Sequence, residues 1–141
     1  MRRAYLALPL LLLSCGDSDL QKVAKGLQIA AESVGTLQTT VIEANKLALL
    51  TEDETRTTLE ICVEINKAGK DAVAVTRGLV ALDSTSKSQI LTILTPVIKS
   101  VDAAVGRSML IKNEDTRAKI RTILLTIQSA LNSVQLIVGV T

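Results

Sequence analysis

The chain contains no histidine, phenylalanine or tryptophan, and its single tyrosine, Tyr5, lies near the amino terminus. Without histidine it has no Ser-His-Asp triad, no Cys-His pair, and no His-bearing zinc or haem site. The scarcity of aromatic rings argues against base stacking on nucleic acids and against an aromatic membrane belt. The carboxylates form no convergent acid–base pair in the sequence pattern. We therefore expect a protein that is not an enzyme, needs no cofactor or metal, and does not bind nucleic acid.

The size and composition are those of a folded protein rather than a disordered one. The chain has 141 residues, of which 48% are hydrophobic and 21% are charged. Such a chain is long enough to bury a core of its own. We expect one structural domain, over residues 20–141.

The first fifteen residues have the pattern of an export signal. Arg2 and Arg3 give a positive start, residues 4–13 form an apolar run, and small Ser14 follows. This order is typical of a secretory signal, and the apolar run is shorter than the ~20 residues that span a bilayer. We predict a signal peptide over residues 1–14. Its removal takes away Arg2 and Arg3, leaving 14 basic against 14 acidic residues, so the mature chain is neutral and has no general attraction for nucleic acid or anionic lipid.

The segment Leu12-Leu13-Ser14-Cys15 resembles the lipobox of bacterial lipoproteins, with Leu13 bulkier than the residue usual at its position. The resemblance covers residues 1–15 only and concerns a signal, not a fold. It implies that Cys15 carries lipid, becomes the first mature residue, and anchors the protein to a membrane of the bacterial cell envelope. Residues 15–19 are then a lipidated amino terminus and a short tether. By resemblance to enterobacterial lipoprotein sorting, Gly16 after the cysteine favours the outer over the inner membrane. An ordinary signal peptide with an incidental cysteine is the alternative.

From residue 20 onward, apolar residues recur at alternating spacings of three and four, in four segments. This periodicity predicts amphipathic helices, and the width of the apolar stripes favours a bundle core over a two-stranded seam. We predict an all-α fold, an up-down-up-down antiparallel four-helix bundle with helices at about 19–49, 52–80, 84–110 and 114–138. The core positions are Leu20, Val23, Leu27, Ala30, Val34, Leu37, Val41, Ala44 and Ala48; Ile61, Ile65, Ala68, Ala72, Val75 and Leu79; Ile90, Leu94, Val97, Val101 and Ala104; and Ile120, Leu124, Ile127, Leu131, Val134 and Val138.

Polar turns separate the four segments. Thr51 and Glu54 have the spacing of a capping box, and residues 83–86 and 113–116 offer further N-cap side chains. Such short turns make neighbouring helices antiparallel. The amino terminus and the turn at 82–86 then share one end of the bundle, and the turns at 51–54 and 113–116 share the other, some 40 Å away. An arrangement in which hairpins open and pair between chains stays possible, because heptads do not determine the number of chains.

Two sets of polar residues are candidates for contact with a partner. The first comprises the acidic residues of the distant turns: Glu52, Asp53, Glu54, Glu114 and Asp115. These could hold a divalent cation, but helix capping and solubility explain them fully. The second comprises three amides, Gln128, Asn132 and Gln135, in the uncharged stretch 122–141. The amides make that stretch amphipathic, which fits a bundle helix better than a transmembrane span.

Other positions have expected structural roles. Cys62 lies beside the second stripe and is expected to be buried, with an intermolecular disulfide as the alternative. Pro96 should bend the third helix near residues 92–95. Four glycines inside helices point to closely approaching helix axes; they are Gly26, Gly35, Gly69 and Gly106.

These features together favour a non-catalytic envelope lipoprotein. We expect a helical bundle, tethered to a membrane through Cys15, that acts as a protein-interaction or self-assembly module, with a protein partner or a second copy of itself. Two alternatives remain. The aromatic-free core could carry a small apolar or acyl ligand, or the helices could insert into membranes as helical pore formers do.

Overall fold

The computed structural model describes residues 18–139, which form four α-helices and no strand. The helices are α2 (Asp19–Lys46), α3 (Glu52–Thr76), α4 (Ser84–Ser108) and α5 (Glu114–Val138). The predicted all-α fold is confirmed. Cys15 and the signal segment lie outside the described residues.

Side chains cap the start of every helix. Thr51 and Glu54 form the predicted capping box: the Thr51 hydroxyl accepts from the Glu54 amide at 3.0 Å, and the Glu54 carboxylate accepts from the Thr51 amide at 2.9 Å. Ser18 with Gln21 and Asp83 with Ser86 form the same reciprocal arrangement. At α5 the carbonyl oxygen of the Asn113 side chain accepts from the Thr116 amide at 2.9 Å. Each cap satisfies an amide without a partner inside the helix, which explains why the predicted starts agree with the structure.

The predicted helix ends at 49, 80 and 110 are too late, since the helices end at Lys46, Thr76 and Ser108. The backbone turns left-handed soon after the first two helices, at Ala48 (φ 57°) and Gly78 (φ 76°). After α2 and α4 the apolar pattern does continue, but in the loops: Leu50 and Ile111 fold back and close one end of the core. The apolar periodicity of the sequence therefore continues beyond the last residue of the helix.

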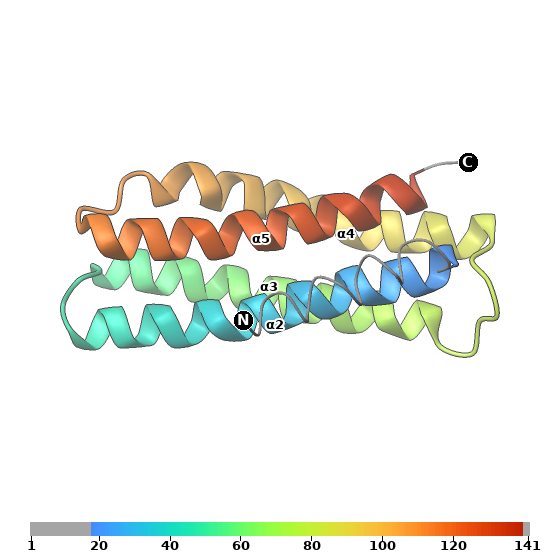
Figure 1. The fold of residues 1–141 in the computed structure, drawn as a ribbon, viewed down its shortest axis with the longest axis horizontal. Coiled ribbons are helices and arrows are strands. Elements are labelled where there is room, and N and C mark those ends of the chain that lie inside the picture. The colour runs from blue at the N-terminus through green and yellow to red at the C-terminus, as the bar shows by residue number, and fades with distance from the viewer. Residues whose placement is uncertain (1–17, 140–141) are drawn as a thin grey trace, which may run out of the picture.

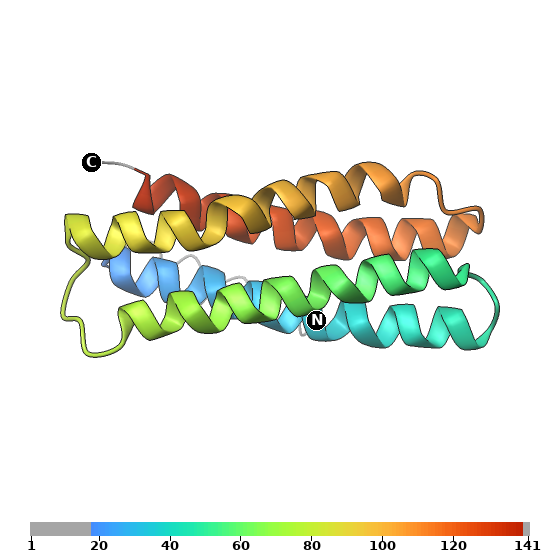
Figure 2. The ribbon, with the colours of Figure 1, turned by 180° about the vertical axis from the view of Figure 1, so that it is seen from behind.

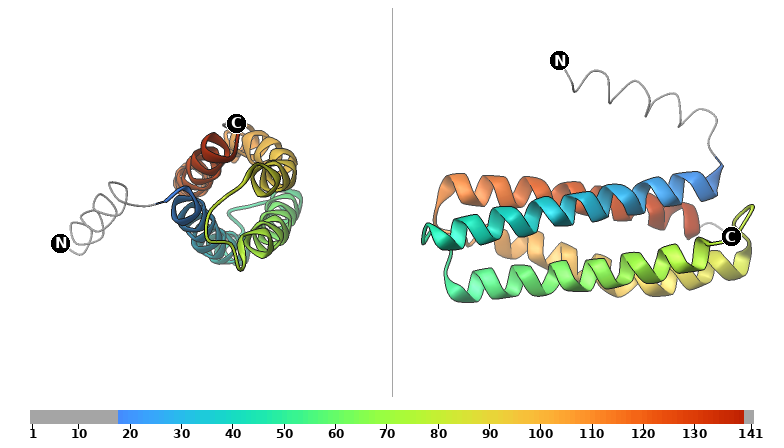
Figure 3. Two further views of the ribbon diagram at one scale, coloured as in Figure 1. Left: turned by 90° about the vertical axis from the view of Figure 1, so that its right-hand side faces the viewer. Right: turned by 90° about the horizontal axis from the view of Figure 1, so that it is seen from below.

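The four helices lie side by side as a square bundle in which each packs against two neighbours, as Figure 1 and the reverse view in Figure 2 show. The neighbouring pairs are α2–α3, α3–α4, α4–α5 and α5–α2. The end-on view in Figure 3 shows the four helices around a common axis. We call the end with the α2–α3 and α4–α5 loops the distal pole. The proximal pole holds the start of α2, the α3–α4 loop and the end of α5, as predicted from the short turns (Figure 1).

The core consists almost entirely of the predicted stripes. Nearly all the predicted core positions are buried; the exceptions are Leu20, Val75 and Leu79, which are half-buried, and Ala48, which is exposed. The largest fully buried side chains are Leu, Ile and Val from α2, α4 and α5. The core contributed by α3 is smaller in volume, since two of its five buried residues are alanines.

Only one of the four helix-interior glycines marks a close approach of helices. A Cβ atom at Gly26 would lie 2.5 Å from Val134 Cγ2, so α2 and α5 pack too closely there for a side chain. At Gly35, Gly69 and Gly106 a Cβ atom would meet nothing within 4 Å. The expectation that all four permit close packing is therefore wrong for three of them.

Cys62 and Pro96 are accommodated without breaking the bundle. Cys62 is buried, and desolvation raises the pKa of its thiol to about 11. A backbone hydrogen bond lowers this pKa, but by less than desolvation raises it. A disulfide between two chains at this position would need the helix to open first. Pro96 is exposed, and α4 continues through it as one helix.

Candidate functional site

The distal pole exposes several large apolar side chains in its two loops. Leu47 and Leu49 of the α2–α3 loop are 70% and 36% exposed. Met109 and Leu110 of the α4–α5 loop are 51% and 77% exposed. At the proximal pole, the loop between α3 and α4 exposes Val80, and the nearby helix ends expose Val73 and Leu136. Isolated apolar residues on a surface need no explanation, but four in adjoining loops at one end are typical of a contact surface.

Acidic residues flank these loops at the starts of α3 and α5. Glu52, Asp53, Glu114 and Asp115 are exposed, and Glu54 is half-buried. Their places at the first helical turns are electrostatically favourable, because the N-terminus of a helix carries partial positive charge. The structure thus brings both predicted acidic groups to one pole.

Two of these acids already have local roles. Glu54 belongs to the capping box of α3, and Asp53 pairs with Arg56 at 2.5 Å. Both members of that ion pair are well exposed, so it contributes little to stability. Glu52, Glu114 and Asp115 make no hydrogen bond or ion pair with residues 18–139 and are accessible to a partner.

The charge of the distal pole is mixed rather than uniformly acidic. Lys46 and Lys112 are exposed at or beside the same loops. Arg117 turns inward, and its Nη1 donates to the Ile111 carbonyl oxygen at 3.1 Å, which helps to hold the α4–α5 loop. Within residues 18–139, no group of three Cys, Asp or Glu residues is arranged to hold a metal ion. The distal pole suits contacts with apolar side chains framed by charges of both signs.

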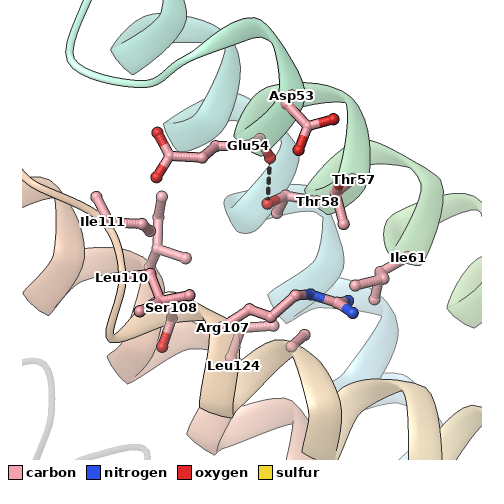
Figure 4. Close-up of a pocket in the computed structure, with 12 residues that line it drawn as sticks. Asp53, Glu54, Thr57, Thr58, Ile61, Arg107, Ser108, Leu110, Ile111 and Leu124 are labelled. Atoms are coloured by element: carbon pink, nitrogen blue, oxygen red, sulfur yellow. Dashed lines mark hydrogen bonds between the residues drawn. The ribbon is translucent and has the colours of Figure 1, made fainter.

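A pocket of about 150 Å³ opens between the start of α3 and the end of α4. Its inner wall is apolar and includes Ile61, Ile120 and Leu124. Figure 4 shows Asp53 and Glu54 on one side of the pocket and Arg107, which extends from α4 toward α3, on the other. The Thr58 hydroxyl donates its proton within α3, to the Glu54 carbonyl oxygen at 2.8 Å (Figure 4).

The pocket combines an apolar wall with hydroxyl, carboxylate and guanidinium groups at its rim. Its hydroxyl groups come from Thr57, Thr58 and Ser108. A pocket of about 150 Å³ is comparable to an engineered apolar cavity that holds benzene. It can therefore receive one apolar side chain of a partner, with a charge beside it.

The amide stripe of α5 lies away from the distal pole. Gln128 is half-buried, and its Nε2 donates to Asp102 Oδ1 of α4 at 2.7 Å, so this side chain serves the bundle itself. Asn132 is exposed and Gln135 half-buried. Gln128 lies 14 residues after Glu114, or about 21 Å along the helix. The structure does not join the two predicted candidate sets into one surface.

The loop residues of the distal pole and Arg107 are absent from the predicted sites. The sequence does carry a signal for the loop residues. Two apolar residues in a row follow the helix at 49–50 and again at 109–110, whereas a turn exposed to solvent needs only polar ones. Which member of each group is buried depends on the loop backbone. Arg107 has no distinguishing pattern, and its place beside a pocket follows from the packing of α4 against α3.

One helix among residues 18–139 is long and apolar enough to cross a membrane by length and composition. It is α4, rather than the uncharged stretch that begins at Thr122. In the bundle α4 packs between α3 and α5, and its residues Ile90, Leu94 and Val101 belong to the shared core.

Comparison with known proteins finds no matching family model, no matching curated protein and no matching solved structure.

Proposed function

We propose that this protein is a non-catalytic lipoprotein of the bacterial cell envelope that presents the distal pole of its bundle to another protein or to a second copy of itself. The observation that carries this proposal is the set of exposed apolar side chains in the two distal loops. Leu47 and Leu110 are the most exposed of the four. Apolar side chains framed by charged ones are typical of the centre of a protein–protein contact.

The direction of the chain supports the same function. Because α2 begins at the proximal pole, a tether at Cys15 would hold that pole at the membrane. The 28 residues of α2 then carry the distal pole about 42 Å outward. Such a helical bundle acts as a spacer that holds a contact surface above the lipid, where a partner can reach it.

The anchor is tested first. Expression in a Gram-negative host with labelled palmitate should label the natural protein and leave Cys15→Ala unlabelled. The intact mass of the purified natural protein should correspond to a chain that starts at residue 15 and carries lipid. A labelled Cys15→Ala protein, or an unlabelled natural one, would contradict the lipid anchor. Neither result would bear on the proposed contact surface.

The contact surface is tested by photo-crosslinking in cells. A photoreactive amino acid at Leu47 or Leu110 should yield one defined crosslinked product. The matched control is the same amino acid at Val80, which is even more exposed but lies at the proximal pole. Equal products from the three positions would indicate random collisions and refute the proposal.

Self-assembly and binding of another protein give different results in solution. If the distal pole pairs with a second copy, the unlipidated Cys15→Ala protein should form dimers at micromolar concentration, and Leu47→Ser with Leu110→Ser should abolish them. If the partner is another protein, the Cys15→Ala protein stays monomeric, and the crosslinked product has a mass that differs from twice the chain.

A further inference from the structure

A second, larger cavity lies far from the distal pole, between α2 and α3 in the half of the bundle nearer the proximal pole. Its volume is about 310 Å³, twice that of the distal pocket. This volume is at the lower end of the ~300–1,000 Å³ range of small-molecule sites. We call it the α2–α3 groove.

The interior of the α2–α3 groove is apolar and reaches the centre of the bundle. Leu27 of α2, Leu94 of α4 and Leu131 of α5 form its floor, and all three are buried. Its walls include small residues, among them Ala24 and Ala31 on α2, beside the amides of Gln28 and Asn66. The space between α2 and α3 therefore results from side chains that are too short to fill it.

The same shortage of side-chain volume appears on α3. Gly69 lines the groove, and a Cβ atom added there would meet nothing within 4 Å. A glycine inside a helix costs about 1 kcal/mol relative to alanine, and here no close contact requires it. Its absent side chain leaves the groove open.

The groove is elongated along the helices. Its lining on α3 extends from Ile65 to Arg77, twelve residues or about 18 Å. The hydrocarbon core of a bilayer is ~30 Å thick, so one leaflet, the length of a single acyl chain, is ~15 Å. Along α3 the groove is thus as long as one acyl chain, and the facing wall on α2, from Ala24 to Ala31, covers about 10 Å of it.

The charges that line the groove have one sign. Lys70 and Arg77 are both exposed and face the groove, seven residues or two helical turns apart on α3. Neither side chain makes an ion pair or a hydrogen bond with residues 18–139. No carboxylate lines the groove; Glu32, near it on α2, accepts from Gln28 Nε2 at 3.1 Å. A cationic margin on an apolar groove is complementary to an amphiphile with an anionic head.

We propose that the α2–α3 groove binds one long-chain fatty acid, with its hydrocarbon chain between α2 and α3 and its carboxylate at Lys70 and Arg77. The carboxylate then lies at the side of the bundle where the groove opens toward the proximal pole. This inference does not depend on the contact surface at the distal pole, and either can fail without the other.

Residues 15–141 carrying Cys15→Ala provide the protein for the test, because the four helices and their closed core lie within this segment and it has no lipid of its own. Palmitate should bind with one-to-one stoichiometry in calorimetry and native mass spectrometry and raise the melting temperature. Hexadecanol, with the same chain and no charge, should bind at least tenfold more weakly. Failure of palmitate to bind or to stabilise the protein would overturn the proposal.

Two variants test the position of the chain. Gly69→Leu should fill the groove and weaken palmitate binding at least tenfold while the protein stays folded, since α3 has space for the new side chain. The matched control is Gly35→Leu on the exposed face of α2, which should bind palmitate as the parent does. Unchanged affinity in Gly69→Leu would overturn the proposed position.

Charge substitutions test the position of the carboxylate. The double variant Lys70→Gln with Arg77→Gln should bind palmitate about tenfold more weakly and hexadecanol unchanged. Lys67→Gln with Lys99→Gln makes the same change in net charge away from the groove and should bind both probes as the parent does. Equal losses in the two double variants would overturn a specific carboxylate site.

Two other occupants of the groove, the lipid on Cys15 and a second copy of the chain, would give different experimental results. If the lipidated natural protein fails to bind palmitate while the Cys15→Ala protein binds it, the lipid on Cys15 fills the groove. If Gly69→Leu converts a dimer to a monomer, the groove is an interface between copies. Either result overturns the proposal of a free fatty acid.

Discussion

The two sides of α2 are packed in opposite ways. On one side α2 meets α5 so closely that Gly26 has no room for a Cβ atom next to Val134. On the other side α2 meets α3 across the α2–α3 groove of about 310 Å³. Both sides rely on small residues. A glycine therefore permits close packing only where a residue of the neighbouring helix fills the space next to it. Val134 fills the space next to Gly26, and no residue fills the space next to Gly69.

The closed side contains the larger share of bulky buried side chains. Leu131 of α5 is fully buried and also forms part of the groove floor. Leu131→Ala should lower the free energy of unfolding by about 3 kcal/mol, because it removes buried apolar surface and leaves a void. Leu136→Ala on the exposed face of the same helix should change it by less than ~0.5 kcal/mol. Urea unfolding followed by circular dichroism measures both, and equal effects would refute the assigned register of α5.

Gly26 is the sharpest test of the close contact between α2 and α5. Gly26→Ala should lower the free energy of unfolding by about 1–3 kcal/mol, because the new methyl group collides with a buried and stiff valine side chain. Combining Gly26→Ala with Val134→Ala should cost less than the sum of the two single changes, since the smaller residue makes room. Additive costs in urea unfolding would show that α2 and α5 do not touch at this point.

Gly69 should respond with the opposite sign. Gly69→Ala should raise the free energy of unfolding by about 0.5–1 kcal/mol, because alanine favours the helix and meets no neighbour. Gly35→Ala, equally open, should do the same. A rise in melting temperature for both variants, against a fall for Gly26→Ala, would confirm the comparison between the two sides of α2. A loss of stability in Gly69→Ala would mean that the groove is closed in solution.

The sequence predicts the helices and their buried stripes well because both follow from local rules. A period of three and four determines which face of a helix is apolar, and a residue such as Thr51 caps its helix through side chains only three residues apart. The helix ends are less predictable, since Leu50 and Ile111 keep an apolar pattern while they serve the core from loops. Periodicity reports which residues are buried but not whether the backbone around them is helical.

The candidate sites depend on contacts between distant parts of the chain. The acidic turns are predicted to share one pole because connectivity and helix length determine that arrangement. The exposure of Leu47 and Leu110 is not predictable in this way, because each lies close to a residue of the same kind that is buried. The α2–α3 groove is harder still. It requires knowing that Gly69 faces an unfilled space while Gly26 faces Val134.

The same helix that is open at the groove is closed at Cys62, near its middle. Cys62 of α3 is buried, and burial raises the pKa of its thiol from its usual value of 9.0 to about 11. Because the folded value is the higher one, this thiol favours the folded state below about pH 9 and loses that contribution as the pH rises toward 11. At pH 8 a thiol reagent should modify Cys62 of the Cys15→Ala protein at least a hundredfold more slowly than in urea. Equal rates would place Cys62 on the surface and leave α3 open along its whole length.

The smallest expected effect distinguishes the caps of the two poles. Thr51 and Asn113 cap the distal helix starts without charge, whereas Asp83 caps α4 at the proximal pole. The hydrogen bond from the Ser86 amide, 2.7 Å long, lowers the pKa of the Asp83 carboxyl. A lowered pKa means that Asp83 stabilises the fold above its unfolded value near 4, and that this contribution is lost as the pH falls through the folded value. Asp83→Asn keeps an N-cap acceptor and should flatten the dependence of urea unfolding on pH below about pH 5. Thr51→Ala should lower the free energy of unfolding by a similar amount at every pH. The effect of Asp83 should be small because its carboxylate is exposed, and an unchanged pH dependence in Asp83→Asn would show that another carboxyl group titrates with unfolding.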